Sequence, residues 1–203
     1  MKLFASQGSP FARKIRVMLI EKSAPHEVEM VDLWAANNFK KTNPIGKVPA
    51  LKLDDGRALV NSPLIADYVD GRFPEPRFIP ADPDQRLEVR RWEALADGTM
   101  DAAVACFYEA RFHDEASRSR AWLERQRGKL DSGFAALERM LEARPWCVGG
   151  AMSLADIALA CNIGFINVRR PEFFPQEKYP GLTKLWKNLE SRESFRKTVP
   201  PPA

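Results

Sequence analysis

The first 22 residues predict a short buried strand that leads through a tight turn into an amphipathic helix. An apolar run at residues 3–5 is followed by Gln7-Gly8, a pair typical of turns. Ser9 is a favourable helix N-cap, and Pro10 suits the first helical position, where its missing N–H costs nothing. The apolar residues of the helix recur at helical spacing: Phe11, Ile15, Met18 and Leu19.

Ser9 therefore lies at the carboxyl end of a strand, beside the free backbone N–H groups of a helix N-terminus. The helix dipole adds partial positive charge there, so the position favours an anion. The simplest alternative is that Ser9 only caps the helix.

The rest of the first third of the chain predicts a small α/β layer with a mixed sheet. Polar and apolar residues alternate over 26–31, as in a strand, whereas 33–41 is weakly patterned and predicts a loop or short helix. Two further strands are expected around 48–53 and 58–60, joined by the hairpin turn Asp54-Asp55-Gly56. Asn61-Ser62-Pro63 predicts the start of a helix with apolar positions at Leu64, Ile65, Tyr68 and Val69.

A proline-rich passage over 73–83 interrupts this pattern, and everything after it is helical in character. Helical stripes are expected along residues 89–107, 123–141, 154–165 and 182–189, with a short last helix in 191–197. Ser153 and Asp156 predict a capping box at the start of the third of these helices. That helix is apolar almost all round, so we expect it to be central and buried.

Composition excludes several chemistries. The chain has only two histidines, His26 and His113, no Cys-x-x-Cys motif and no metal-ligand spacing. Its three cysteines are sparse, which favours reduced thiols in a cytoplasmic protein. The net charge of +4 is spread over both halves without a basic stripe, and no apolar run reaches membrane-spanning length. We therefore expect no metal, no nucleic-acid partner and no membrane partner.

Several motifs, taken together and in this order, resemble the glutathione S-transferase family. They cover nearly the whole chain: Ser9-Pro10-Phe11-Ala12-Arg13-Lys14, Asn43-Pro44-Ile45-Gly46-Lys47-Val48-Pro49, Asn61-Ser62 and Ser153-Leu154-Ala155-Asp156-Ile157. The sequence is most similar to bacterial members related to the theta and zeta classes, close to the group called YibF-like.

The resemblance implies a thioredoxin-like α/β domain at residues 1–75, a linker at 76–83 and an all-α domain at 84–203. It implies a cytoplasmic homodimer acting in detoxification, with glutathione as co-substrate and a small hydrophobic electrophile as second substrate. Ser9 stands where a thioredoxin carries its first cysteine and Ala12 at the second, so disulfide exchange through the protein's own thiols is excluded.

The resemblance also assigns roles in the first domain. Ser9 would stabilise the glutathione thiolate, and Arg13, one turn later, would add positive potential near the sulfur or simply be a solvated helix residue. A cis Val48-Pro49 bond would expose the Val48 backbone to the cysteinyl part of glutathione; among X-Pro bonds in general a trans bond is the default. Lys47 would meet the glycyl carboxylate, and Ser62 the γ-glutamyl carboxylate. Asn61 departs from the family's usual acidic residue before that serine.

The second domain would complete the site. Asp97-Gly98-Thr99-Met100-Asp101 matches a family pattern in which Asp101 reaches across the dimer to the γ-glutamyl amino group; two solvated carboxylates are the alternative. The electrophile pocket would lie between Ser9 and the first long helix. Its expected lining residues, which could instead be ordinary core, are Phe11, Met100, Val104, Phe107, Tyr108 and Arg111.

The sequence thus supports a glutathione transferase with catalytic Ser9. The main alternative is a non-enzymatic binding or regulatory protein that retains the fold. Glutathione-dependent isomerisation or peroxide reduction would use the same site.

Overall fold

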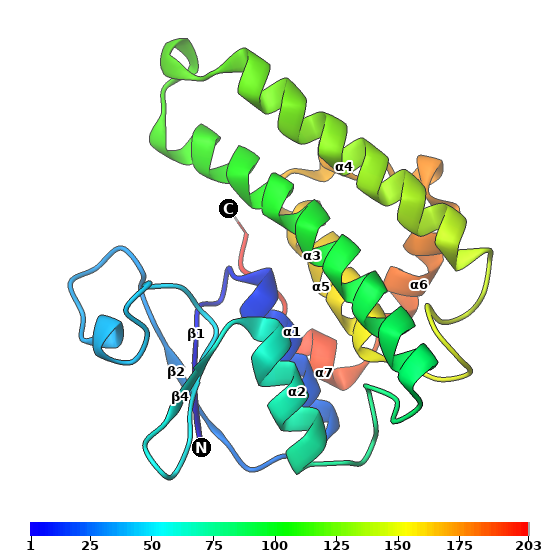
Figure 1. Ribbon diagram of the computed structural model, residues 1–203. Helices are drawn as coiled ribbons and strands as arrows, with labels where there is room; N and C mark the ends of the chain where they lie inside the picture. The colour runs from blue at the N-terminus through cyan, green and yellow to red at the C-terminus, as the bar shows by residue number, and fades with distance from the viewer. Residues whose placement is uncertain (203) are drawn as a thin grey trace.

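The computed structural model describes residues 1–202 and contains a four-stranded sheet beside a body of helices (Figure 1). The strands are β1 (Lys2–Ala5), β2 (Glu27–Met30), β3 (Ala50–Lys52) and β4 (Ala58–Val60). Their order in the sheet is β2-β1-β3-β4, with β1 and β2 parallel and the other pairs antiparallel. The predicted mixed sheet is confirmed.

The two faces of the sheet have different surroundings. Leu3 and Leu51 share a face, because they are partners in the β1–β3 register, and both are completely buried beneath α1 (Pro10–Glu21) and α2 (Ser62–Arg72). Lys2 and Phe4 point to the opposite face, which is hollowed and open. Strand β2 alternates as expected but is exposed along its whole length, because it lies at the edge of the sheet.

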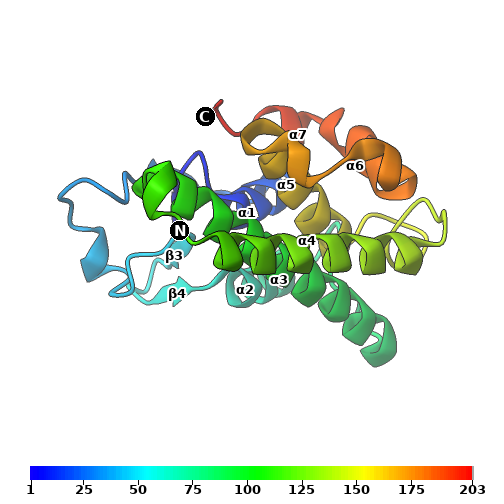
Figure 2. The same cartoon turned by 90° about the horizontal axis from the view of Figure 1, so that it is seen from above.

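The second half of the chain is helical. Its helices are α3 (Pro83–Phe112), α4 (Arg120–Leu141), α5 (Leu154–Arg169), α6 (Pro180–Glu190) and α7 (Glu193–Arg196). Seen from above, α5 lies between the pair α3 and α4 and the pair α6 and α7 (Figure 2). All residues from Leu154 to Ile166 are buried, which confirms that this helix is central. Single turns of 3-10 helix occur at Phe39–Lys41, Glu115–Ser117, Pro171–Phe173 and Gln176–Lys178.

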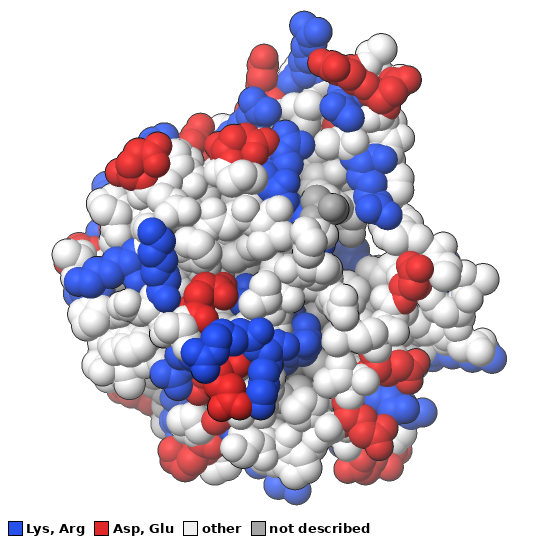
Figure 3. All heavy atoms as spheres, turned by 180° about the vertical axis from the view of Figure 1, so that it is seen from behind, with Lys and Arg blue, Asp and Glu red and all other residues white. Residues whose placement is uncertain are grey.

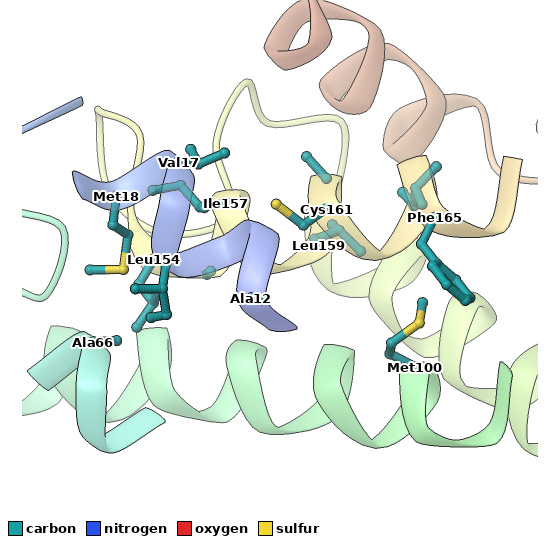
Figure 4. Close-up of a cluster of buried hydrophobic side chains, with 14 of the residues drawn as sticks. Ala12, Val17, Met18, Ala66, Met100, Leu154, Ile157, Leu159, Cys161 and Phe165 are labelled. Atoms are coloured by element: carbon teal, nitrogen blue, oxygen red, sulfur yellow. The ribbon is translucent and has the colours of Figure 1, made fainter. Parts of the chain in front are cut away.

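The core is continuous between the sheet domain and the helical domain. Helix α1 packs on α5, where Met18 lies beside Leu154, and α3 packs on the same helix (Figure 4). Ala12, Met18, Leu154 and Ile157 are completely buried. Helix α1 therefore has one face on the sheet and another on the helical body.

The proline-rich passage is regular neither as helix nor as strand, as expected, yet it is held firmly in place. Phe78 and Ile79 are almost completely buried, and their backbone N–H groups donate to the two carboxylate oxygens of Asp70 at 2.8 and 3.1 Å. Lys22 donates to the carbonyls of Phe73 and Pro76. The buried ion pair of Lys22 with Asp70, at 2.8 Å, joins α1 and α2 to this passage.

Lysine and arginine side chains alternate with acidic ones on the face of the molecule shown in Figure 3, among wider uncharged areas. Over residues 1–202, no helix is both long enough and apolar enough to cross a membrane.

The start of α5 has the predicted capping box. The Asp156 carboxylate accepts hydrogen bonds from the Ser153 N–H at 2.8 Å, the Ser153 hydroxyl at 2.7 Å and the Cys147 N–H at 2.8 Å. Asp156 is fully buried, and this burial raises the pKa of its carboxyl above the ordinary value, against the opposing effect of these hydrogen bonds. Three donors therefore depend on one side chain.

We expect Asp156→Ala to lower the free energy of unfolding by about 2–4 kcal/mol, because it leaves buried N–H donors unsatisfied at the start of the central helix. Asp131→Ala, which removes an exposed aspartate of α4, should change it by less than about 0.5 kcal/mol. Urea unfolding followed by circular dichroism measures both. A similar small effect of the two substitutions would contradict this role of the capping box.

Candidate functional site

A cavity of about 320 Å³ lies where the carboxyl end of β1 meets α3 and α5. Nine of the residues expected from the sequence line it: Ser9, Phe11, Lys47, Val48, Asp101, Val104, Phe107, Tyr108 and Arg111. Nine others do so as well: Ser6, Gly8, Pro10, Val31, Asp32, Leu33, Trp34, Phe165 and Arg169. Both domains therefore contribute to its wall.

The register of the sheet explains why segments far apart in sequence meet here. Ala50 at the start of β3 pairs with Phe4 in β1 and with Val60 at the end of β4. The residues that follow β1, precede β3 and follow β4 consequently lie together at one end of the strands, which forms one edge of the sheet. That edge receives the Ser9 turn, the Lys47-Val48-Pro49 segment and the Asn61-Ser62 start of α2.

Ser9 is the N-cap of α1, and its hydroxyl oxygen accepts a hydrogen bond from the Ala12 N–H at 3.2 Å. A hydroxyl can accept and donate at the same time. The capping bond uses an acceptor position, so the O–H of Ser9 is still able to donate to a ligand in the cavity.

The other two segments at this edge have unusual backbones. The Val48-Pro49 bond is cis, as the family resemblance implies. Asn61 has a φ of 75° and a ψ of 129°, a conformation costly for a residue other than glycine. Pro49, Asn61 and Ser62 lie outside the set of residues that line the cavity, and Ser62 is almost fully buried at the start of α2.

Asp97 and Asp101 lie on one helical face but have different surroundings. Asp97 is bound by Lys14 at 2.7 Å, and Lys14 also contacts Glu93 at 2.8 Å, so this aspartate is not the solvated carboxylate considered above. Asp101 lines the cavity of its own subunit together with Lys47. Partial burial raises the pKa of the Asp101 carboxyl, while the positive charges of Lys47 and Lys14 act in the opposite direction.

Two expectations about site residues need correction. Met100 is completely buried and packs toward α5, so it belongs to the core and does not line the cavity (Figure 4). Arg13 lies outside the cavity wall and is not solvated either, since only 1% of it is exposed. Helical periodicity places Met100 on a buried face without saying which neighbour that face meets. It places Arg13 off the apolar stripe of its helix, so its burial against the helical domain was not predictable from the pattern.

Arg13 instead ties α1 to the end of the chain. Its guanidinium donates two hydrogen bonds of 2.9 Å to the carboxylate of Glu190, and further ones to the Phe195 carbonyl and the Thr198 hydroxyl. Gly164 makes room for this arrangement, because a methyl group there would lie 2.7 Å from Glu190 Oε1. The Glu190 carboxylate offsets the positive potential that Arg13 would otherwise contribute.

Two of the unexpected lining residues, Trp34 and Phe165, belong to an aromatic cluster. Trp34 contacts Tyr108 edge-on at 5.8 Å between ring centroids and Phe112 at 4.7 Å, so the loop after β2 is joined to the end of α3. Phe165 contacts Phe107 at 6.0 Å. A tryptophan in the weakly patterned stretch 33–41 was the one signal in the sequence for this contact. Phe165 could not be distinguished from the core stripe of its helix.

A larger hollow, of about 680 Å³, lies on the open face of the sheet. It contains none of the residues expected at the site, and its wall includes Lys2, Glu29 and Lys52. In residues 1–202, no three histidine, cysteine, aspartate or glutamate side chains are grouped so that they could hold a metal ion. The expected site residues that line a cavity therefore line the smaller one.

The fold agrees with comparisons to known proteins. The glutathione S-transferase N-terminal domain model matches residues 3–77, and the C-terminal domain model matches residues 120–184. The chain belongs to the glutathione S-transferase family.

Similar proteins are found among both sequences and solved structures. The glutathione S-transferase-like protein YibF of Escherichia coli K12 is 39% identical over the full length of both chains. A glutathione S-transferase of Methylobacterium radiotolerans, solved with glutathione sulfonate, is 40% identical, with a TM-score of 0.93 over 100% of this chain and 95% of that one. One from Methylobacillus flagellatus, solved with glutathione, is 39% identical, with a TM-score of 0.93 over 98% and 99% of the two chains.

The structure predicts that replacing Arg13 alone destabilises the fold. Arg13→Gln should lower the free energy of unfolding by about 3 kcal/mol, because it leaves the Glu190 carboxylate without its bidentate partner. Arg16→Gln is the matched control on the same helix, since Arg16 makes a single hydrogen bond of 3.4 Å. Urea unfolding checks both, and equal stability of the two variants would contradict the assignment.

Proposed function

We propose that this protein is a glutathione transferase that binds glutathione at the cavity and stabilises its thiolate at Ser9 for attack on a hydrophobic electrophile. The observation that most supports this is the free O–H of Ser9 at the N-terminus of α1, in a cavity shared with Lys47 and Val48. The glutathione and glutathione sulfonate present in the two solved relatives also support it.

The chemistry requires a modest stabilisation of the thiolate. A cysteine thiol has a pKa of about 8.5, so most of it is protonated and unreactive at neutral pH. Lowering that pKa by about 2 units takes about 2.7 kcal/mol of preferential stabilisation of the thiolate. A hydroxyl donor, together with the positive end of a helix dipole, supplies energy of this size.

The rest of glutathione would be bound by the segments at the same edge of the sheet. The backbone of Val48, before the cis bond to Pro49, would pair with the cysteinyl part as an added strand does, and Lys47 would bind the glycyl carboxylate. Ser62 and the first N–H groups of α2 would bind the γ-glutamyl carboxylate. The costly backbone of Asn61 supports a functional role for that turn.

The electrophile would lie against the helical side of the cavity. Phe11, Val104, Phe107 and Tyr108 give this side an apolar surface, and Arg111 stands at its rim. We assign glutathione binding to residues 1–75 and most of the electrophile wall to residues 84–203, with 76–83 between them. We further infer a cytoplasmic homodimer with a role in detoxification, in keeping with the buried free thiols of Cys106, Cys147 and Cys161.

The first prediction from this proposal concerns Ser9. Ser9→Ala should still bind glutathione, but the pKa of the bound thiol should return toward about 8.5, and the conjugation rate at pH 7 should fall by about 10- to 100-fold. Thiolate absorbance against pH and calorimetric titration measure these effects.

Ser119→Ala is the matched control, because Ser119 caps α4 through the Trp122 N–H in the same way, at 3.3 Å. It should cost about 1 kcal/mol of stability, as a lost cap does, without a change in the thiol pKa. If neither the wild type nor Ser9→Ala binds glutathione, the enzyme proposal fails and a non-enzymatic binding protein takes its place.

The second prediction concerns Asp101. It is the expected partner of the glutathione ammonium, because the uncharged Asn61 cannot supply a negative charge. Asp101→Asn should raise the dissociation constant of glutathione about tenfold, because it removes a charge-assisted hydrogen bond. Glu88→Gln, an exposed substitution on the same helix, should leave it unchanged. An unaltered affinity in Asp101→Asn would contradict the role.

Mixed dimers test whether Asp101 serves its own subunit or its partner. One chain carries Asp101→Asn and the other Ser62→Ala. If Asp101 reaches across the dimer, both defects fall on the same site, and each mixed dimer keeps one intact site. If Asp101 serves its own subunit, both sites are damaged, and tight glutathione binding is lost.

A further inference from the structure

Two arginines in the wall of the cavity have no acidic partner. Arg111 lies in the last turn of α3 and Arg169 is the last residue of α5. Neither side chain forms an ion pair or donates a hydrogen bond within residues 1–202. The Nε of Arg169 is shielded from solvent and has no partner. A shielded guanidinium N–H without an acceptor is costly and calls for a ligand.

The usual structural roles of arginine do not explain this pair. Other arginines nearby are engaged, since Arg170 binds Glu172 at 2.6 Å. The carbonyls at the end of α3 are bound by Arg118, which donates to Ala110 and His113. Arg111 therefore neither pairs with an acid nor caps its own helix.

The charged groups around Arg169 do not neutralise its guanidinium. Burial and the positive charge of Arg111 both lower the pKa of the Arg169 guanidinium. The two acids in the cavity wall have other positive or donor groups nearby: Asp32 accepts from the Trp34 N–H at 2.9 Å, and the charges of Lys47 and Lys14 act on the pKa of the Asp101 carboxyl. An anion bound between Arg111 and Arg169 would relieve the repulsion between them.

The position of Arg169 relates it to the reaction. A methyl group on Gly8 would lie 3.1 Å from Arg169 Nη2, so the guanidinium reaches the turn that leads into Ser9. The guanidinium also lies over the rings of Phe107 and Phe165, 5.6 and 6.0 Å from their centroids. The cation is therefore set in an aromatic wall, beside the place proposed for the glutathione sulfur.

We propose that the electrophile pocket selects substrates that carry a carboxylate on a flat, apolar body, with Arg169 and Arg111 binding the carboxylate. The planar guanidinium matches a carboxylate in two parallel hydrogen bonds, and the aromatic wall matches the apolar body. This inference rests on the proposed transferase function and makes the two arginines the residues that determine its specificity.

A matched pair of probes tests the proposal. One is a chlorodinitrobenzoate with chlorine para to the carboxylate, and the other is its methyl ester. With either probe, the glutathione sulfur forms a bond to the ring carbon, and chloride leaves with the electron pair of the broken C–Cl bond. We expect the ratio of kcat/KM for acid to ester, corrected for the uncatalysed rates, to fall about tenfold or more in Arg169→Gln and in Arg111→Gln. Arg170→Gln, next in sequence but outside the cavity, should keep the wild-type ratio.

Binding of an unreactive probe separates this inference from the transferase function. Calorimetry measures the binding of dinitrobenzoate and of its methyl ester to the protein saturated with S-methylglutathione. If S-methylglutathione does not bind, the same titrations are made with the free protein. A tighter dissociation constant for the acid, lost in Arg169→Gln, supports the arginine pair even where no turnover occurs. Equal binding of acid and ester in the wild type, or an unchanged acid-to-ester ratio in both arginine variants, would overturn it.

Discussion

The burial of α1 between the sheet and the helical body is the constraint on which the rest of the structure depends. The helix is apolar on the sheet side, yet Arg13 and Lys14 on it are about 1% exposed and point into the helical domain. Lys14 binds Glu93 and Asp97 of α3, and Arg13 binds Glu190 at the end of α6. Such pairs add little net stability after the cost of desolvation, but an unpaired charge there would be costly. The ion pairs therefore determine the relative position of the two domains more than they raise the stability of the protein.

That fixed junction determines the site. Ser9 begins α1, so its position relative to α3 and α5 is set by the same contacts that hold the helix. The cis Val48-Pro49 segment and the Asn61 turn are placed by the sheet register. A cavity with one wall from each domain keeps its shape only if α1 cannot shift against the helical body. The buried ion pairs and the anchored passage around Phe78 oppose that shift.

Local chemistry made much of the fold predictable from the sequence. The N-cap at Ser9, the hairpin at Asp55-Gly56 and the capping box at Ser153 each follow from short-range preferences, and the structure has all three. Met100 could not be placed in this way, because periodicity identifies a buried face without naming its neighbour. Arg13 could not be placed either, because it lies off the apolar stripe of its helix and is buried only by the second domain. Trp34 and Arg169 were missed for a related reason. Their roles depend on a loop and a helix end that meet only after the domains have packed.

The cavity has a distribution of charge that suits two anionic reactants. Lys47 lines the cavity with Asp101, whereas Arg111 and Arg169 stand at the ends of two helices without acidic partners in the described part of the chain. Helix C-termini favour cations, so the fold itself stabilises guanidinium groups at that end of the cavity. In the proposed reaction, a thiolate would attack a carboxylate-bearing electrophile, so two negative groups would come together. Their repulsion is weak in water and strong in a low-dielectric cavity. Arg169, beside the turn that leads into Ser9, would offset this repulsion close to the sulfur, where it is greatest. On the proposed mechanism, the residue that selects the substrate would then also raise the rate of the reaction.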